Sequence, residues 1–306
     1  MLTSVDEDGP ARSRRFHHRE FRVDRLLERK GATTVSVCLP ARNEAATVGP
    51  IVETIRAELV ERVPLVDEIL VIDDHSEDRT AQVAATAGAR VVDASEVLTE
   101  HGSGIGKGEV LWKSVFASEG DLIVWCDADI RNFGIRFVTG VLGPLLTDPS
   151  IQFVKGFYDR PDLAGLGGGR VTELVARPLL SMHFPELCEI VQPLSGEYGG
   201  RREVLEQVPF VQGYAVDVCL LIDVAERVGL EAIAQVDLEV RHHRNRPLDE
   251  LSPQAMAVAQ AILHRAQPEL VGTRAMLHRP LRPPTPIDVE QRPPLVGLDS
   301  YIARSA

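Results

Sequence analysis

Apolar and polar residues follow a repeating strand-then-helix pattern through the first half of the chain. Short, nearly continuous apolar runs predict strands that are buried on both faces. Between them, apolar residues recur every three or four positions, which is the spacing of one face of an α-helix. The predicted strands cover residues 35–39, 68–74, 90–93 and 121–127, and the predicted helices between the first three cover 48–59 and 80–87.

This alternation predicts an α/β fold of the Rossmann-like kind, in which a mostly parallel sheet carries helices on both faces. Ligands of such sheets bind beyond the carboxyl ends of the strands. The polar residues that directly follow each predicted strand are therefore the first candidates for a functional site.

The second half of the chain is less regular, and its ends differ from the middle. We divide the sequence into an N-terminal arm, a regular α/β half, a second half of the same domain, and a proline-rich tail. The tail is expected to be extended, either wrapping the surface or pairing with another subunit. The four segments are residues 1–30, 31–160, 161–270 and 271–306.

Composition narrows the function classes. The 306 residues carry a formal net charge of -12, which argues against nucleic acid as the main partner. The apolar runs are shorter than the ~18 residues of a membrane span, and the acidic first ten residues do not resemble a signal peptide. The four cysteines show no C-x-x-C spacing. We therefore expect a cytoplasmic protein with reduced thiols.

Two carboxylates follow the most apolar of the predicted strands. Asp127 and Asp129 are two positions apart, so an extended backbone points both the same way. Such a pair offers hard oxygen ligands to Mg²⁺ or Mn²⁺, and a diphosphate would complete the coordination shell. A solvated acidic turn is the alternative.

Two glycine-rich segments open predicted helices. In 102–108, backbone amides and Lys107 are suited to phosphate oxygens, although the spacing is that of neither a P-loop nor a dinucleotide fold. In 167–172, Arg170 and Thr172 stand at a helix start, where the dipole favours an anion. A flexible loop and a capped helix start are the respective alternatives.

Three further polar segments follow predicted strands. These are Pro40–Glu44, Asp73–Ser76 and the basic loop Arg241–Arg246. A histidine of the basic loop could bind a metal together with Asp129. The arginines of the same loop suit an anionic acceptor. Alternatively, Asn43 caps a helix, the two aspartates form a turn, and the basic loop is only a charged surface.

In this order, the segments 40–44, 73–76 and 127–129 resemble the donor site of family-2-like glycosyltransferases of the GT-A fold. More narrowly, the chain resembles a retaining family that transfers glucose from UDP-glucose to 3-phosphoglycerate. The narrower resemblance spans about residues 30–270 and is carried by 106–114, 169–173, 193–200 and 243–248. It implies a metal-dependent enzyme, with 31–160 binding the nucleotide sugar, 161–270 binding the acceptor, and a homodimer as assembly.

The resemblance also assigns roles to individual positions. A donor pocket, a reaction centre, an acceptor site and a metal site are implied. Two departures stand out, since Arg42 replaces an aliphatic residue and Asp217 a longer Glu. The implied residues are Pro40, Ala41, Arg42, Glu44, Asp74, Lys107, Asp127 and Ala128 for the donor, Asp127, Asp217 and the Leu194 carbonyl for the reaction centre, Gly169, Arg170, Thr172 and Asn245 for the acceptor, and Asp129 and His243 for Mg²⁺ or Mn²⁺.

Three other functions fit parts of the same pattern. A sugar nucleotidyltransferase shares a related α/β core, but its G-x-G-T-R segment has no counterpart near the first predicted strand. A transferase acting on a polyprenyl phosphate would be expected to carry a membrane segment. A nucleotide-sugar sensor without turnover would not need Asp127, Asp129 and His243 together.

Overall fold

The computed structural model describes residues 13–104, 106–161, 169–242 and 248–305. Its centre is one eight-stranded sheet in the order β1-β9-β6-β7-β5-β2-β3-β4. All neighbouring strands run parallel except β7, which is antiparallel to both β5 and β6, so the predicted mostly parallel sheet is confirmed. The strands are β1 (Arg14–His17), β2 (Val35–Ala41), β3 (Glu68–Asp73), β4 (Arg90–Asp93), β5 (Leu122–Trp125), β6 (Phe153–Asp159), β7 (Tyr198–Arg201) and β9 (Ile233–Val240).

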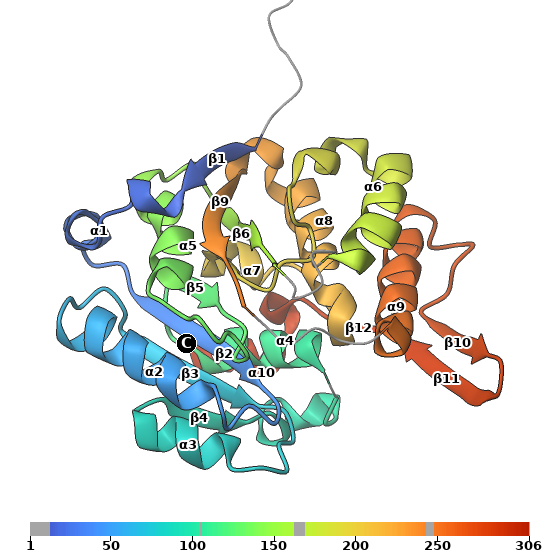
Figure 1. Ribbon diagram of the computed structural model, residues 1–306, viewed down its shortest axis with the longest axis horizontal. Coiled ribbons are helices and arrows are strands. Elements are labelled where there is room, and N and C mark those ends of the chain that lie inside the picture. Colours follow the sequence, from blue (N-terminus) through green and yellow to red (C-terminus); the bar gives the residue numbers. More distant parts are fainter. Residues whose placement is uncertain (1–12, 105, 162–168, 243–247, 306) are drawn as a thin grey trace, which may run out of the picture.

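Helices cover both faces of this sheet, as the pattern predicted (Figure 1). One apolar core lies between the sheet and α1, α2, α3 and α5, and a second lies between the sheet and α4, α6, α8, α9 and α10. The helices are α1 (Val23–Lys30), α2 (Val48–Ile55), α3 (Thr80–Ala87), α4 (Lys107–Ala117), α5 (Arg136–Thr147), α6 (Arg177–His183), α7 (Arg202–Leu205), α8 (Val216–Val228), α9 (Leu248–Ala266) and α10 (Asp299–Ser305).

The double cover explains why the central strands are apolar at nearly every position. In β2, Val37 and Leu39 belong to one core while Cys38 belongs to the other. All three are completely buried. Burying a large apolar side chain stabilises the fold by roughly 1.5–3 kcal/mol. Because both faces of the strand are buried, apolar residues are favoured at every position and do not alternate with polar ones.

Three strand assignments differ from the sequence prediction. β2 continues through Pro40 because β5 has already ended its pairing at Cys38 and only β3 remains alongside. β7 contains Gly199 and Gly200, which favour a turn, but both are paired on each side within the sheet. The N-terminal arm supplies β1, which pairs with β9 at the sheet edge.

The C-terminal segment makes two smaller strand pairs. β10 (Arg274–Arg279) and β11 (Arg282–Asp288) form a hairpin that projects from the body beside α9 (Figure 1). Next along the chain, β12 (Gln291–Arg292) pairs with β8 (Phe210–Val211). Across the described ranges, the helices lack the combined length and apolar character that crossing a membrane requires.

Candidate active site

The polar segments that follow β2, β3 and β5 meet at one edge of the sheet and line a cavity of about 510 Å³. That volume is typical of a small-ligand site. The cavity brings together every described residue for which the sequence predicted a role, while His243 and Asn245 lie outside the described residues. Those lining residues are Pro40, Ala41, Arg42, Glu44, Asp74, Lys107, Asp127, Ala128, Asp129, Gly169, Arg170, Thr172, Leu194 and Asp217.

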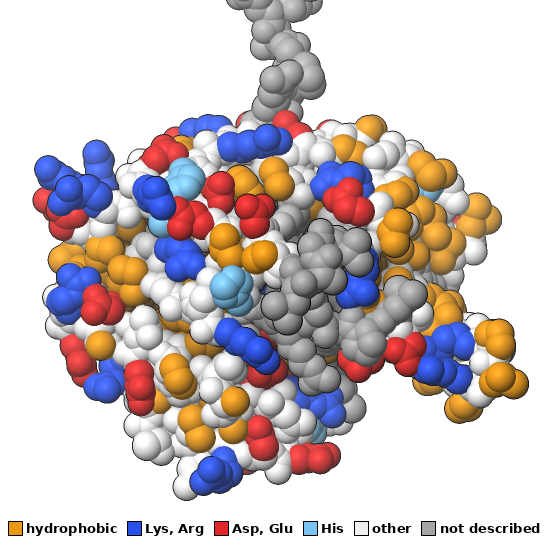
Figure 2. All heavy atoms as spheres, in the orientation of Figure 1, with side chains coloured by type: hydrophobic (Ala, Val, Ile, Leu, Met, Phe, Trp, Pro, Cys, Tyr) orange, Lys and Arg blue, Asp and Glu red, His pale blue; other side chains and the backbone are white. Residues whose placement is uncertain are grey.

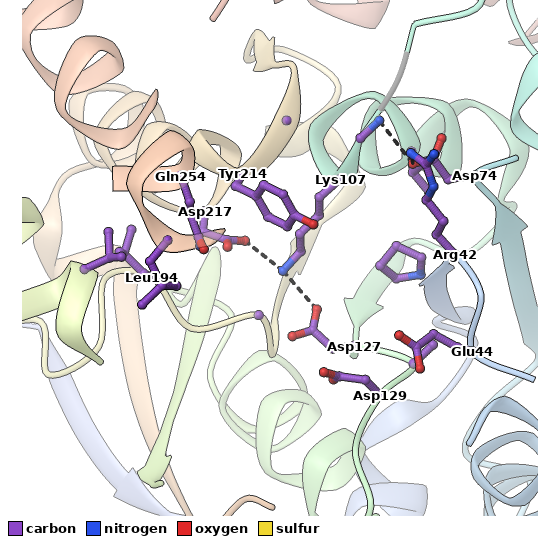
Figure 3. Close-up of a pocket in the computed structure, with 18 of the residues that line it drawn as sticks. Arg42, Glu44, Asp74, Lys107, Asp127, Asp129, Leu194, Tyr214, Asp217 and Gln254 are labelled. Atoms are coloured by element: carbon purple, nitrogen blue, oxygen red, sulfur yellow. Dashed lines mark hydrogen bonds and ion pairs between the residues drawn. The ribbon is translucent and has the colours of Figure 1, made fainter. Parts of the chain in front are cut away.

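Lys107, the first residue of α4, crosses the floor of this cavity (Figure 3). Its ammonium lies 2.9 Å from Oδ1 of Asp127 and 3.0 Å from Oδ1 of Asp217. Asp217 also accepts a hydrogen bond from the hydroxyl of Tyr198 at 2.9 Å. Both carboxylates are therefore already engaged by donors that fix their orientation.

Arg241 directly follows β9 and reaches the carboxylates from the other side. Its Nη2 donates to Asp127 at 2.8 Å and to Asp129 at 2.6 Å, and its Nε lies 3.2 Å from the fully buried Glu197. The sequence predicted an acceptor-binding role for the arginines of this loop. For Arg241, the structure shows a buried link between three carboxylates, while its acceptor role stays a prediction.

The charges of this group depend on one another. Burial disfavours ionisation of Asp127, yet Lys107 and Arg241 outweigh burial and hold its pKa well below the usual value. Burial likewise opposes the charged form of Lys107, but Asp127 and Asp217 raise its pKa. The site therefore keeps a fixed positive centre beside fixed carboxylates, which is how proteins preorganise a field around a departing anion.

A second lysine lies behind the cavity. Lys155 on β6 is fully buried and donates to the backbone carbonyls of Ser195 at 3.0 Å and Asp217 at 3.3 Å. Its ammonium also lies 4.1 Å from the centre of the Tyr198 ring. Burial lowers the pKa of Lys155 to about 7, against the opposing effect of Asp217.

The loops after β2 and β3 are tied together on the donor side. Asn43 has a φ of 58°, donates from its backbone to Ser76 Oγ, and accepts from the backbone of Glu77 at 2.8 Å. It therefore bridges two loops instead of capping a helix. Asp74 accepts from the backbone of Gly106 at 3.1 Å, and burial, reinforced by Asp129, raises the pKa of Glu44.

The predicted acceptor residues stand at the start of a helical segment on the opposite wall. Gly169 has a φ of 92°, which favours glycine, and its carbonyl accepts the first helical bond from Glu173 at 2.9 Å. Arg170 and Thr172 follow, and Leu251 and Gln254 of α9 line the same region. This places backbone amides, a guanidinium and a hydroxyl at one end of the cavity.

The carboxylates present suit a divalent cation. The side chain of Asp129 is 34% exposed, and Arg241 takes only its Oδ1. Mg²⁺ prefers one or two carboxylates completed by phosphate oxygens and water, which this donor set can offer. Elsewhere in the described ranges, His17, His18 and Glu239 form a trio of possible ligands, but Arg19 already pairs with Glu239 there.

Some residues of the site were not singled out from the sequence. They come from segments whose local pattern gives no sign of chemistry, and they are Arg160, Gly213, Tyr214, Leu251 and Gln254, with Lys155 behind the cavity. A second set lies in segments that the sequence analysis named without giving these residues a role of their own: Gly106, Val110, Val171 and Gly196, with Glu197 behind them.

The fold and the sequence both match known glycosyltransferases. The family model of glycosyl transferase family 2 matches residues 36–146, which include the segments after β2, β3 and β5. A parallel-sheet core with this match, and with carboxylates and a lysine in the cavity, defines the class: the protein is a glycosyltransferase of the GT-A fold.

Relatives narrow the class. Glucosyl-3-phosphoglycerate synthase of Petrotoga mobilis is 46% identical over 308 residues, covering 94% of this chain and 95% of that protein. The Mycobacterium tuberculosis glucosyl-3-phosphoglycerate synthase, solved with Mn²⁺, UDP-glucose and phosphoglyceric acid, superposes with a TM-score of 0.85 at 43% identity, over 94% of this chain and 99% of that one. The chain belongs to the glucosyl-3-phosphoglycerate synthase family.

A further solved structure carries a different sugar in its name. Mannosyl-3-phosphoglycerate synthase of Rubrobacter xylanophilus superposes with a TM-score of 0.84 at 40% identity, over 92% of this chain and 96% of that one. Both named enzymes attach a hexose to the same acceptor, so the identity of the donor sugar is the finer question.

Proposed function

We propose that the protein transfers glucose from UDP-glucose to 3-phosphoglycerate, giving glucosyl-3-phosphoglycerate and UDP with retention of configuration. The observation that carries this proposal is a single cavity lined by two chemically distinct groups of residues. Asp129 and Lys107 are suited to a metal-bound diphosphate, and Arg170 and Thr172 are suited to a phosphorylated acid.

The difficult step is the departure of UDP. Lys107 and the amides at the start of α4 provide fixed positive potential for the developing charge. A divalent cation held by Asp129, with His243 as the predicted second ligand, would supply Lewis-acid stabilisation of the leaving diphosphate. On the other wall, Arg170 and Thr172 would orient the acceptor.

The state of the two central carboxylates supports retention without a covalent intermediate. Asp127 and Asp217 are both paired with Lys107, and Asp217 is also bonded to Tyr198. Donors fix the orientation of both carboxylates and lower their nucleophilicity. We therefore favour a front-face displacement beside the Leu194 carbonyl, with the leaving phosphate taking the acceptor proton. A trapped glycosyl adduct on Asp127 or Asp217 would contradict it.

A release assay over a panel of donors and acceptors tests the proposal. UDP release with Mg²⁺ or Mn²⁺ is expected to require 3-phosphoglycerate, and Asp129→Ala is expected to abolish the metal-dependent part. Asp121→Ala is the matched control, because the Asp121 side chain bonds Thr34 at the other end of the strand and does not line the cavity. Pyrophosphate release would identify a nucleotidyltransferase instead.

Mannosyl transfer is the second candidate, favoured by the likeness to the Rubrobacter enzyme. The same assay separates the two, because glucose and mannose donors can be compared at equal concentration with the same acceptor. A higher kcat/KM with a mannose donor would replace glucose in the proposal and leave the acceptor unchanged. Transfer to a polyprenyl phosphate in preference to 3-phosphoglycerate would replace the acceptor.

A homodimer is the proposed assembly. Hydrophobic side chains gather over α6 and along the projecting hairpin (Figure 2). The exposed apolar residues of that region include Leu174, Met182, Met276 and Leu281, and an isolated two-stranded hairpin is marginally stable in water. A second copy covering this surface would bury the exposed apolar side chains and support the hairpin. Sedimentation is expected to show dimers for the native chain and monomers for Met276→Asp/Leu281→Asp.

We also propose a cytosolic location. All four cysteines are free thiols, and Cys38, Cys126 and Cys219 are buried, which is the usage of a reducing compartment. Burial raises the pKa of Cys38 and Cys219 to about 12, so these thiols stay unreactive. Cell fractionation with antibody detection tests the location, and recovery of the protein in a secreted or membrane fraction would contradict it.

A further inference from the structure

An arginine of the C-terminal segment reaches the glycine-rich loop in front of α4. Arg292 in β12 donates to both carboxylate oxygens of Glu109, at 2.6 and 3.1 Å, and to the carbonyl of His101 at 2.6 Å. Glu109 is completely buried, and the Arg292 side chain is 14% exposed. A bidentate, charge-assisted pair of this kind is both strong and directional.

Glu109 and its neighbour on α4 hold the rest of that loop. Lys113, also fully buried, lies 3.0 Å from Glu109 Oε1 and donates to the carbonyl of Ser103 at 3.0 Å. Gly104, with a φ of 47°, packs so closely on the Glu109 carboxylate that a Cβ there would overlap it. The loop backbone therefore rests on one buried ionic group of which Arg292 is a member.

The other end of the loop enters the cavity. The backbone of Gly106 donates to Asp74 at 3.1 Å, and Lys107 follows with its ammonium between two carboxylates (Figure 3). A displacement of the loop would therefore move two things together, namely the Gly106 amide that bonds Asp74 and the start of α4.

The same C-terminal segment also holds a second wall of the cavity. β12 pairs with β8, and the backbone of Gln212 donates to the carbonyl of Glu290 at 2.9 Å. Gly213 and Tyr214, which come next, line the cavity. At this point the two walls touch, since a Cβ on Gly106 would lie 3.1 Å from the Cα of Gly213.

We infer that residues 290–293 are a positioning element of the donor half of the site, and that Arg292 is the residue through which they set the glycine-rich loop. Arg292 itself does not line the cavity. It acts through Glu109 and the His101 carbonyl, so its loss should weaken donor binding without touching the acceptor wall. The identity of the donor as a uridine nucleotide rests on the proposed function.

The test compares Arg292→Met with Arg304→Met. Arg304 is the matched control because it also joins the C-terminal segment to α4, lying 5.5 Å from the Phe116 ring and donating to the Ser118 carbonyl, at the far end from the loop. Arg292→Met is expected to raise the UDP-glucose KM and the UDP Kd, measured with Mn²⁺, by roughly tenfold, with an unchanged 3-phosphoglycerate KM. Arg304→Met should change neither.

Amide hydrogen exchange gives a readout that needs no ligand. Exchange across 101–104 should accelerate in Arg292→Met by more than its lower thermal midpoint accounts for, and should not accelerate in Arg304→Met. Arg292→Lys keeps the positive charge but lacks the planar guanidinium that makes two parallel hydrogen bonds. It is expected to fold and to show a smaller increase in exchange and in donor KM. Unchanged donor KM and exchange in both Arg292 variants would overturn the inference, as would an equal rise in donor and acceptor KM. Wild type that binds no UDP would instead overturn the proposed function, and the exchange result would still decide on Arg292.

Discussion

The ammonium of Lys107 lies 2.9 Å from Oδ1 of Asp127, so the first residue of α4 and the carboxylate after β5 form one ion pair across the cavity floor. Each group is supplied by a different part of the sheet edge. The ion pair can therefore form only when the start of α4 and the end of β5 are correctly placed against each other.

Lys107→Met should reduce kcat/KM by about 10²-fold or more, because it removes a fixed positive charge from the region where UDP develops charge. It should also lower the free energy of unfolding by roughly 3 kcal/mol, because Asp127 and Asp217 lose a buried partner. Steady-state kinetics and denaturant titration measure both. Lys107→Arg is the conservative comparison, and an unchanged kcat/KM in Lys107→Met would show that the charge is not used.

Gly196→Ala should lower kcat more than tenfold and lower the free energy of unfolding by roughly 1–3 kcal/mol. A Cβ at this position would overlap the carboxylate of Asp127 and push it away from Lys107 and Arg241. Gly272→Ala is the matched control, since a Cβ there would meet nothing within 4 Å. Kinetics and thermal midpoints of the two variants are compared, and equal activity would mean that the position of Asp127 is not critical.

Arg170→Ala and Arg42→Ala should each change the KM of a different substrate. Arg170 lines the acceptor wall, so its loss should raise the 3-phosphoglycerate KM about tenfold and leave the UDP-glucose KM unchanged. Arg42, 3.9 Å from Asp74, lines the donor wall and should affect the UDP-glucose KM alone. Full two-substrate kinetics distinguish the pair, and an unchanged acceptor KM in Arg170→Ala would remove the acceptor assignment.

Lys155→Met should change how stability depends on pH. Burial lowers the pKa of Lys155 to about 7, while the ordinary value is 10.5. Between these values the unfolded chain binds a proton that the folded chain does not, so wild-type stability rises with pH across this window, by at most about 1.4 kcal/mol per unit.

The variant should lose that slope. Urea unfolding at pH 7, 8 and 9 is expected to show the free energy of unfolding of the wild type rising relative to that of Lys155→Met. Below pH 7 the two free energies should depend on pH equally. Asp217, Lys107, Glu197 and Asp127 are the other charged groups that act on Lys155, and all four are unchanged in the variant. Parallel slopes across the window would show that Lys155 stays charged when folded.

The apolar pattern by itself determined the core of this fold. β2, β3 and β5 are buried on both faces, so their side chains are apolar at nearly every position, and that signal is local. The order of polar residues after these strands likewise indicated the cavity edge, because parallel strands end at a common side. Asp127 and Asp129 were found in this way, whereas Lys107 was found from the glycine-rich segment that opens its helix.

What the tertiary structure alone decided are the pairings between segments far apart in sequence. β7 is a strand because neighbours on both sides bond its glycine-containing backbone, and β1 because β9 leaves an open edge. Arg241 contacts the carboxylates because β9 ends beside β6, and Arg292 reaches the glycine-rich loop because β12 pairs with β8. Such contacts depend on the path of the whole chain, which the local sequence pattern does not encode.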